Sequence, residues 1–468
     1  MAQAQHPGPP EDAQRRPEAS RWLVLVVMCV GYFLVLLDVT VVNVALPEIG
    51  EGIGARLSGL QWVVDGYALA LAALLLAGGT IGDLRGHKRV VLSGLVIFGL
   101  ASLGCGLAPD TGVLIGARVV QGGGAALLLP STLAIITHAF PGKGEQARAI
   151  GIWAGVGSVA LPAGPLLGGA LIAGFGWRAV FLINVPVVVI AGVAAARVVT
   201  ESTDDGDRRL DRPGVIAAGL LLTTVTFAFI QAGHSGLGLR VLVAVVAAVV
   251  LAVVFVAVER SRSDPMLPLG LFGRRDFSTA NTVAGVMNLG TLGLLFLLTL
   301  YLQTVQHRSA LAAGVAVLPL FAPLSVLAPI SGRLTARLGA KTPMAVGLVA
   351  AAVGVASLAR LQPHSAYLTL LPAMLAWGVG LGLLTPAVVA AAVGSVDSDR
   401  AGLASGVNNT FRQAGGAIGI AAFGALAGAP TATQSFVAGL RHAGVLTAVL
   451  FAAATLATLA LVPSNPHK

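Results

Sequence analysis

Long apolar runs separated by short polar segments occupy most of the chain after residue 20. A helix needs about 20 predominantly apolar residues to cross the hydrocarbon core of a bilayer, and fourteen runs approach or exceed that length. The pattern therefore predicts an all-α, polytopic membrane protein with fourteen transmembrane helices. The expected spans are residues 22–46, 61–82, 89–108, 112–136, 149–174, 178–199, 214–233, 239–258, 277–303, 311–335, 342–360, 367–392, 402–427 and 441–462.

A short glycine pattern occurs twice and divides these runs into two sets. Gly79-x6-Gly86 ends the second run and Gly332-x6-Gly339 ends the tenth, each followed two residues later by lysine. Repeated halves with a site between them are the usual architecture of secondary transporters. We therefore expect two six-helix bundles joined by an inserted pair of helices. The expected parts are a disordered, proline-rich cytoplasmic tail (1–20), an N-terminal six-helix bundle (21–199), a linker with two extra helices (200–276), a C-terminal six-helix bundle (277–462) and a cytoplasmic tail (463–468).

Composition and charge agree with a membrane protein. Of the 468 residues, 56% are hydrophobic and only 10% are charged, whereas globular domains are about 25% charged. The net charge of +9 comes from basic residues dispersed among short loops, so we expect no nucleic-acid partner. With the N-terminus inside, 21 of the 29 Lys and Arg residues fall in inner segments and six in outer ones, which predicts cytoplasmic termini in a bacterial inner membrane. Cys29 and Cys105 both lie in apolar runs and give no disulfide framework.

Three ionisable residues interrupt the apolar runs of the expected N-terminal bundle: Asp38, Asp65 and Arg118. An arginine within a span keeps its charge and costs at least ~2.5–3.5 kcal/mol on insertion scales. At 1.5 Å per residue, Asp38 lies about 24 Å from the inner end of its helix, and Arg118 and Asp65 lie about 9 and 6 Å from the outer ends of theirs. All three are therefore expected in the outer half of the bundle.

Two interpretations of this group are open. The three residues either form a structural ion pair or handle protons, and the second is favoured because three ionisable groups exceed what packing requires. Two acids cannot both be compensated by one arginine, so either Asp38 or Asp65 can exchange a proton. Asp65 can alternatively be an interfacial residue that water reaches at the helix mouth.

Four strings in the first half, which contain Asp38, Asp83, Arg118 and Pro165, resemble motifs of the fourteen-helix drug:proton antiporter family of the major facilitator superfamily. Asp38 lies in a first-helix motif, and Arg118-x2-Gln121 resembles a helix-4 motif linked to proton coupling. The loop after the second run resembles the superfamily's cytoplasmic loop motif, with Leu84 where a basic residue is usual. The fifth run resembles the antiporter motif, with Ala160 where glycine is usual. The loop residues are Gly79, Asp83, Gly86, Lys88 and Arg89, and the antiporter-motif residues are Gly151, Gly164, Pro165, Gly168 and Gly169.

The resemblance implies roles for these strings. Asp83 would latch the loop against the N-terminus of the thirteenth helix, since a carboxylate is stabilised at a positive helix end; the alternative is an ordinary solvated loop charge. The fifth helix, with Pro162 and Pro165 inviting a kink, would line the interface that opens and closes; small-residue packing is the simpler interpretation. Family-like strings in the second half hold further candidates. The expected substrate-cavity residues are Asn43, Gln121, Tyr301, Gln303, Asn409, Arg412 and Gln413.

The expected function is proton-coupled export of a small drug or antibiotic, by a monomer in the lipid bilayer. The proton gradient would supply the energy, so we expect no cofactor, no metal site and no enzyme activity. No P-loop string occurs, which argues against an ATP-driven pump. An exporter of a metabolite or amino acid is the main alternative, and a channel or sensor is the other. No acidic residue is apparent in the expected spans of the C-terminal bundle to pair with Arg412, which would favour anionic or neutral substrates or bond to backbone carbonyls.

Overall fold

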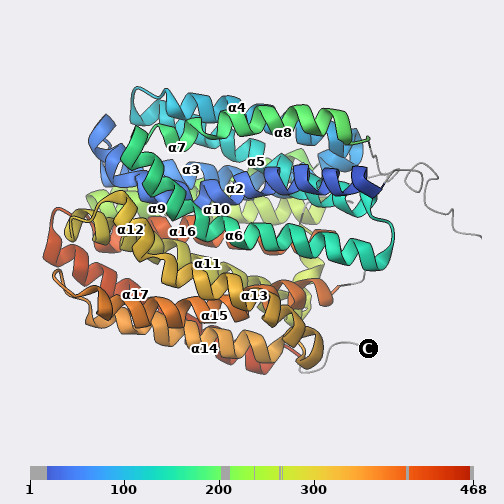
Figure 1. The fold of residues 1–468 in the computed structure, drawn as a ribbon. Helices are drawn as coiled ribbons and strands as arrows, with labels where there is room; N and C mark the ends of the chain where they lie inside the picture. The colour runs from blue at the N-terminus through green and yellow to red at the C-terminus, as the bar shows by residue number, and fades with distance from the viewer. Residues whose placement is uncertain are drawn as a thin grey trace, which may run out of the picture.

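A computed structural model describes residues 18–201, 211–236, 238–262, 265, 267–396 and 400–463, and within these residues it is helical without a β-strand. Residues 1–17 and 464–468 of the two expected tails, and residues 202–210 of the expected linker, lie outside the described residues. The long helices run side by side along one common direction (Figure 1). The first set comprises α2 (Glu18–Ile53), α3 (Leu57–Arg85), α4 (His87–Gly106), α5 (Thr111–Ala139), α6 (Lys143–Phe175), α7 (Ala179–Leu182) and α8 (Asn184–Val198).

Two helices and then a second large set follow. The inserted pair is α9 (Arg212–Ser235) and α10 (Leu239–Ser261). The second set is η1 (Leu269–Gly273), α11 (Arg275–Leu300), the π-helical turn η2 (Tyr301–Val305), α12 (Ala310–Ala316), α13 (Leu318–Leu338), α14 (Lys341–Ser357), η3 (Leu358–Arg360), α15 (Tyr367–Gly394), α16 (Ala401–Ala427) and α17 (Thr433–Leu461).

Fewer helices than the fourteen expected spans meet the length and composition required for membrane crossing among the described residues. Twelve helices of the described chain are long and apolar enough to cross a membrane, and up to thirteen if the bent α6 is counted as one span. The remaining expected span is α16, a 27-residue helix whose Asn408, Asn409, Arg412 and Gln413 reduce its apolar character. The predicted kink in α6 is confirmed, because the helix bends by 42° between Arg148–Gly157 and Pro162–Phe175.

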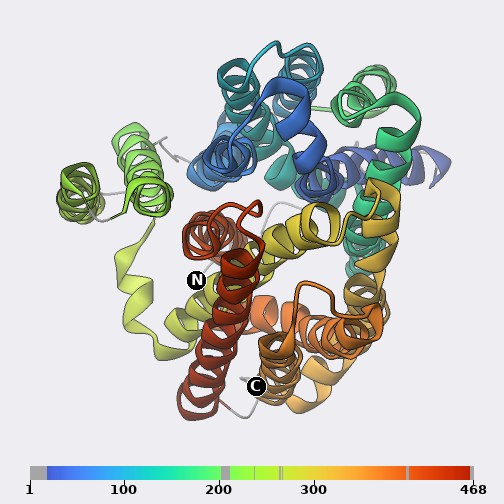
Figure 2. The same cartoon turned by 90° about the vertical axis from the view of Figure 1, so that its left-hand side faces the viewer.

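The helices pack in two groups with the inserted pair at one side. Within α2–α8 the closest pairs are α3 with α5, α4 with α5, and α2 with α6; within α11–α17 they are α11 with α16 and α14 with α15. Figure 2 shows these two groups facing each other, with α9 and α10 standing beside them. Helix α9 contacts both α3 and α16, so the inserted pair lies against the junction of the groups.

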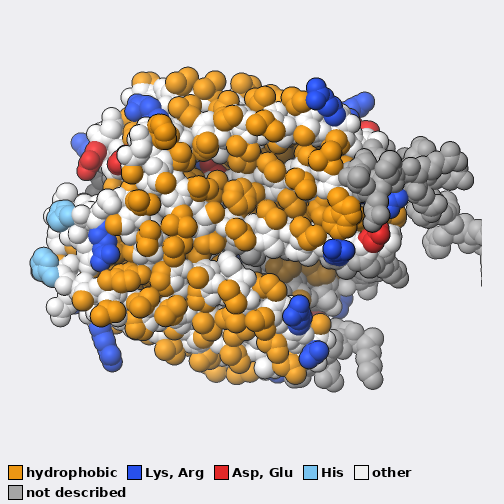
Figure 3. All heavy atoms as spheres, in the orientation of Figure 1, with side chains coloured by type: hydrophobic (Ala, Val, Ile, Leu, Met, Phe, Trp, Pro, Cys, Tyr) orange, Lys and Arg blue, Asp and Glu red, His pale blue; other side chains and the backbone are white. Residues whose placement is uncertain are grey.

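The distribution of apolar and charged side chains on the molecular surface indicates the surroundings of the helices. Apolar side chains cover the broad middle of the face in Figure 3, and charged side chains gather towards its two ends. On α10 only 11% of the most apolar stretch is buried inside the protein, and Val253 is 65% exposed. A helix that is apolar on all sides and exposed requires a lipid environment. The chain is therefore a multi-pass membrane protein.

Candidate functional site

The structure brings Asp38 of α2 and Arg118 of α5 into a fully buried ion pair, each side chain being at most 1% exposed. The Nη1 group of Arg118 donates to Asp38 Oδ2 and, at 2.6 Å, to Gln121 Oε1. The Nε group of Arg118 donates to the carbonyl oxygen of Val63 in α3 at 3.0 Å. Three helices therefore supply partners to one guanidinium group.

Gln121 extends this pair into a wider network, because it lies one turn after Arg118 on the same helix face. Its Nε2 group donates to Asp38 Oδ1 at 3.0 Å and to Ser102 Oγ in α4 at 2.9 Å. Asn184 at the start of α8 also donates to Ser102 Oγ, at 3.4 Å. Gln121 was expected in the substrate cavity, but it is 0% exposed, and the structure places it in this network instead.

Aromatic rings enclose the guanidinium group of Arg118. Its central carbon lies 4.3 Å from the centroid of the Tyr67 ring and 5.8 Å from that of Phe181. Tyr67 is fixed in turn by its hydroxyl, which donates to the carbonyl oxygen of Val35 at 3.2 Å. The rings exclude water from the pair, which strengthens its electrostatic attraction. We define Asp38, Tyr67, Ser102, Arg118 and Gln121 as the buried polar network.

Asp65 does not join this network, although the sequence grouped it with Asp38 and Arg118. It is 0% exposed, so it is not the wetted residue of the alternative interpretation. Neither of its carboxyl oxygens has a hydrogen-bond partner among the described residues. Gln61, one turn earlier on α3, and Ala68, about one turn later, both face α16. Asp65 therefore lies along the face of α3 that packs against the second group of helices.

Direct contacts join the two groups of helices at one end of the molecule. Gln61 donates to the carbonyl oxygens of Ile420 and Ala421 in α16, both at 3.2 Å. Gln303 in η2 donates to the carbonyl oxygen of Val44 in α2 at 2.9 Å. Gln303 was expected in the cavity, and the structure uses its amide to hold the groups together at the end where α2 meets α3.

The glycines of the antiporter motif make two kinds of close approach along α6. A Cβ atom at Gly164 would collide with Thr40 of α2, and one at Gly168 would lie 3.0 Å from Val41, so this part of α6 packs within its own group. A Cβ atom at Gly169 would lie 2.5 Å from Cα of Leu311 in α12, which belongs to the other group. Pro165 likewise faces α12, where its carbonyl group lies against Gly314. A Cβ atom at Gly151 would meet nothing within 4 Å.

The loop between α3 and α4 is fixed by Glu201, a residue that the sequence did not single out. Glu201 accepts from the backbone N–H of Lys88 at 3.0 Å and pairs with Arg89 at 3.5 Å. Asp83 lies 3.3 Å from His87 Nε2. The expected contact of Asp83 with the start of the thirteenth helix involves residues 397–399 and the side chains of residues 401 and 402, which lie outside the described residues.

Gly86→Ala is expected to destabilise the folded protein by about 1–3 kcal/mol, because residue 86 has φ of +95° and a Cβ atom there would collide with Glu201. Thermal unfolding of the detergent-solubilised protein measures the change. Gly116→Ala is the matched control, since a Cβ atom at this position in α5 meets nothing within 4 Å. Equal melting temperatures for the two variants would contradict the role assigned to Gly86.

The remaining cavity candidates differ in their surroundings. Tyr301 is 0% exposed, and its hydroxyl donates to the carbonyl oxygen of Gln362 at 2.6 Å, which joins η2 to the segment between η3 and α15. Asn43 is 3% exposed, and its Oδ1 atom has no partner among the described residues. On α16, Gln413 is buried, whereas Asn409 and Arg412 are half-buried.

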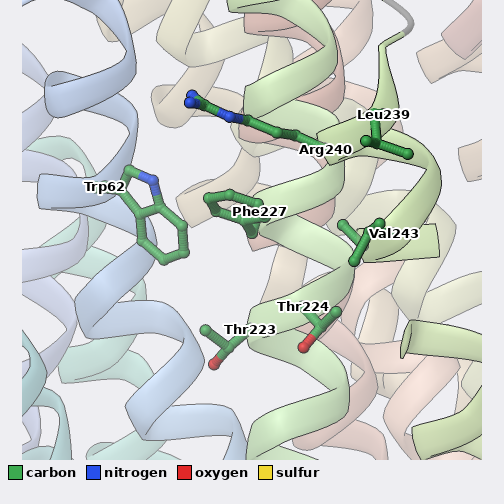
Figure 4. Close-up of a pocket in the computed structure, with 8 residues that line it drawn as sticks. Trp62, Thr223, Thr224, Phe227, Leu239, Arg240 and Val243 are labelled. Carbon is green, nitrogen blue, oxygen red and sulfur yellow. The ribbon is translucent and has the colours of Figure 1, made fainter. Parts of the chain in front are cut away.

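A separate cavity of about 550 Å³ opens between α3, α9 and α10. Its volume suits a ligand, but its walls are apolar and it is open on one side. Figure 4 shows Trp62 of α3 facing Phe227 of α9, with Arg240 of α10 above them and Thr223 and Thr224 below. None of the residues lining this lateral groove belongs to the buried polar network.

Tyr67, Ser102, Asn184 and Glu201 are the site residues that sequence reasoning did not assign. The first three are isolated polar side chains inside apolar runs, which is a usable signal for an intramembrane network. No equivalent signal marks Glu201, because it lies in a charged segment far along the chain from its partners.

The sequence profile of the Major Facilitator Superfamily matches residues 28–420. The multidrug resistance protein Stp of Mycobacterium tuberculosis is 35% identical over 407 residues, covering 86% of this chain and 75% of that protein. The puromycin resistance protein pur8 of Streptomyces alboniger is 38% identical over 410 residues, covering 86% of this chain and 81% of its own length.

The fold has close counterparts among solved structures. The crystal structure of a bacterial homologue of the human lysosomal transporter Spinster, in an inward-facing and unoccupied conformation, superposes with a TM-score of 0.67. The match covers 95% of this chain and 98% of that chain at 19% identity, so the likeness concerns the fold alone. Sequence and fold agree, and the chain belongs to the Major Facilitator Superfamily.

Proposed function

We propose that this protein exports small organic drugs or antibiotics across a bacterial cytoplasmic membrane in exchange for protons. Relatives that share about a third of its sequence are named as multidrug and puromycin resistance proteins. The single observation that carries the coupling is the fully buried Asp38–Arg118 pair, since ionisable groups at such depth usually serve proton or ion pathways. The proposal includes no enzyme activity, no cofactor and no metal.

The finer architecture belongs to this proposal. We assign fourteen spans by counting the bent α6 and the polar α16, both long enough to cross a bilayer. The excess of Lys and Arg in alternate loops supports cytoplasmic termini. Two six-helix bundles, at residues 21–199 and 277–462, would then move against each other in a monomer. The end where Gln61 and Gln303 join the bundles would be the outer one.

The proposed mechanism rests on which buried carboxyl groups have a counter-charge in this conformation. Asp38 has Arg118 as its counter-charge, whereas Asp65 is buried between the bundles and has no counter-charge among the described residues. A carboxyl group in that position is compatible with carrying a proton, and opening of the α3–α16 interface would expose it. Proton exchange at Asp65 and rearrangement of the Asp38–Arg118 pair would thus accompany alternating access. The latch role of Asp83 stays a prediction.

Asp38→Asn is expected to abolish gradient-driven efflux, because the amide removes the ion pair whose rearrangement accompanies alternating access and leaves the Arg118 charge buried without a carboxylate. Breaking such a pair costs about 3–5 kcal/mol, so folding must be checked by size-exclusion chromatography. The measurement is efflux of a fluorescent drug from cells or proteoliposomes with an imposed pH gradient.

Glu145→Gln is the matched control, since it changes the same functional group at an exposed position on α6. We expect it to transport at the wild-type rate. Wild-type efflux by Asp38→Asn would refute the proposed coupling role, and gradient-independent flux through the unmodified protein would indicate a channel.

A further inference from the structure

A stacked pair of aromatic rings lies between two helices of the first bundle, outside the buried polar network. The rings of Tyr32 in α2 and Trp153 in α6 have centroids 3.8 Å apart and an interplanar angle of 17°. Gly157, one turn after Trp153, makes room for this arrangement, because a Cβ atom there would collide with the Tyr32 ring and lie 2.9 Å from Leu36 Cδ1. The aromatic pair is therefore specified by the local sequence of α6.

Arg412 of α16 reaches the same region from the second bundle. Its guanidinium group lies within electrostatic range of the Tyr32 hydroxyl group. No ion pair to Arg412 occurs among the described residues, and its Nε atom is buried without a hydrogen-bond acceptor.

The aromatic pair has an unsatisfied donor of its own. The indole Nε1 of Trp153 is buried and has no acceptor among the described residues. Arg412, Tyr32 and Trp153 are each only half-buried, so part of every side chain remains accessible. This region therefore combines a planar aromatic surface with two unsatisfied donors and a cation, and among the described residues it has no acceptor with negative charge.

We propose that Arg412, Tyr32 and Trp153 form the substrate-recognition site and that it takes planar aromatic compounds bearing a carboxylate or another anionic oxygen. This inference rests on the export function proposed above and names its substrate class. The planar guanidinium group matches a carboxylate through paired hydrogen bonds, and the rings stack on the aromatic part of the ligand.

The two arginines within the membrane then have different roles. Arg118 is neutralised by Asp38 and enclosed by rings, whereas Arg412 keeps its charge available. Tyr32 precedes Asp38 by six residues, which is about 9 Å along α2. An anionic substrate on Arg412 would therefore lie near the network without competing for Arg118.

The test is equilibrium binding to the purified full chain in detergent, measured by isothermal titration calorimetry with 2-naphthoate and its neutral amide, 2-naphthamide. We expect the unmodified protein to bind the carboxylate at least about tenfold more tightly, as for a hydrogen-bonded charge. Arg412→Gln should remove the preference, and Arg412→Lys should keep part of it, because lysine retains the charge but not the planar fork.

Arg240→Gln is the matched control, since it removes a guanidinium group from the lateral groove and should leave the preference unchanged. Equal affinity of the unmodified protein for both compounds, or an intact preference in Arg412→Gln, would overturn the inference. Loss of the preference in Arg240→Gln alone would place the ligand in the groove and overturn it equally. Should Arg412→Gln fail to fold, Trp153→Leu, which removes the ring platform, must weaken binding of both compounds.

This experiment needs no proton gradient, so its outcome is independent of the coupling test. Binding of 2-naphthoate without gradient-driven efflux would leave the site intact and remove the proposed export function. Efflux of a drug by a protein that does not prefer 2-naphthoate would leave the export function intact and overturn the proposed recognition site.

Discussion

Arg118→Ala is expected to abolish coupling of drug export to protons and to lower the free energy of unfolding by about 3–5 kcal/mol. The substitution leaves Asp38 and Gln121 buried without the group that both contact. One elementary charge moved through 100 mV is worth about 2.3 kcal/mol, so loss of one coupled proton must lower the steady drug gradient measurably. Drug-induced proton release and drug efflux in proteoliposomes, across a pH series, provide the measurement.

Arg118→Lys separates a structural role from a coupling role. A lysine keeps the charge but cannot donate simultaneously to Asp38, Gln121 and the Val63 carbonyl with one planar group. A buried lysine can also lose its proton, which arginine does not, so the pH profile of transport should shift. An unshifted profile in Arg118→Lys together with retained coupling in Arg118→Ala would reduce Arg118 to a structural brace. Arg441→Lys, remote from the network and bonded to the Leu361 carbonyl oxygen, is the control for the chemical change.

Gly169→Ala is expected to lower the transport rate by roughly tenfold or more while the protein remains folded. The added methyl group would lie 2.5 Å from Cα of Leu311 and 3.0 Å from the Ala310 carbonyl oxygen, so α6 and α12 must separate at this end. A backbone clash of this kind cannot be relieved by rotating a side chain, and overpacking costs about 1–3 kcal/mol, equivalent to one or two decades in a conformational equilibrium. The substitution should therefore favour the conformation in which this end is open.

Two other glycines of the same motif provide matched controls. Gly164→Ala should instead lower thermal stability, because its clash is with α2 inside one bundle, and Gly151→Ala should be neutral because its surroundings are open. Accessibility is measured by labelling a cysteine at Asn43 with a membrane-impermeant thiol reagent, after the buried Cys29 and Cys105 are replaced by alanine. Identical labelling and transport for the Gly169 and Gly151 variants would refute the interface role of Gly169.

The sequence by itself determined the class of fold and the position of nearly every helix. Apolar runs of about 20 residues can satisfy their backbone hydrogen bonds in a membrane only as helices, so length and composition are sufficient evidence. The helix-breaking prolines of α6 were equally readable, since proline removes a backbone donor wherever it lies. The number of spans could not be counted from apolar runs alone. The polar residues of α16 lower its hydropathy, and they are tolerated in a membrane-crossing helix only where another helix covers them.

Only the tertiary structure decided which intramembrane charges meet. Depth along a helix placed Asp38, Asp65 and Arg118 at similar levels, but it does not give the direction in which each side chain points around its helix. Rotation of α3 turns Asp65 towards α16, whereas the Val63 carbonyl group, two residues earlier, contacts Arg118. Successive residues of a helix are rotated by 100°, so residues that are neighbours in sequence can lie in different helix–helix interfaces. Which neighbouring helix each face contacts is decided by the packing of helices that are distant in sequence.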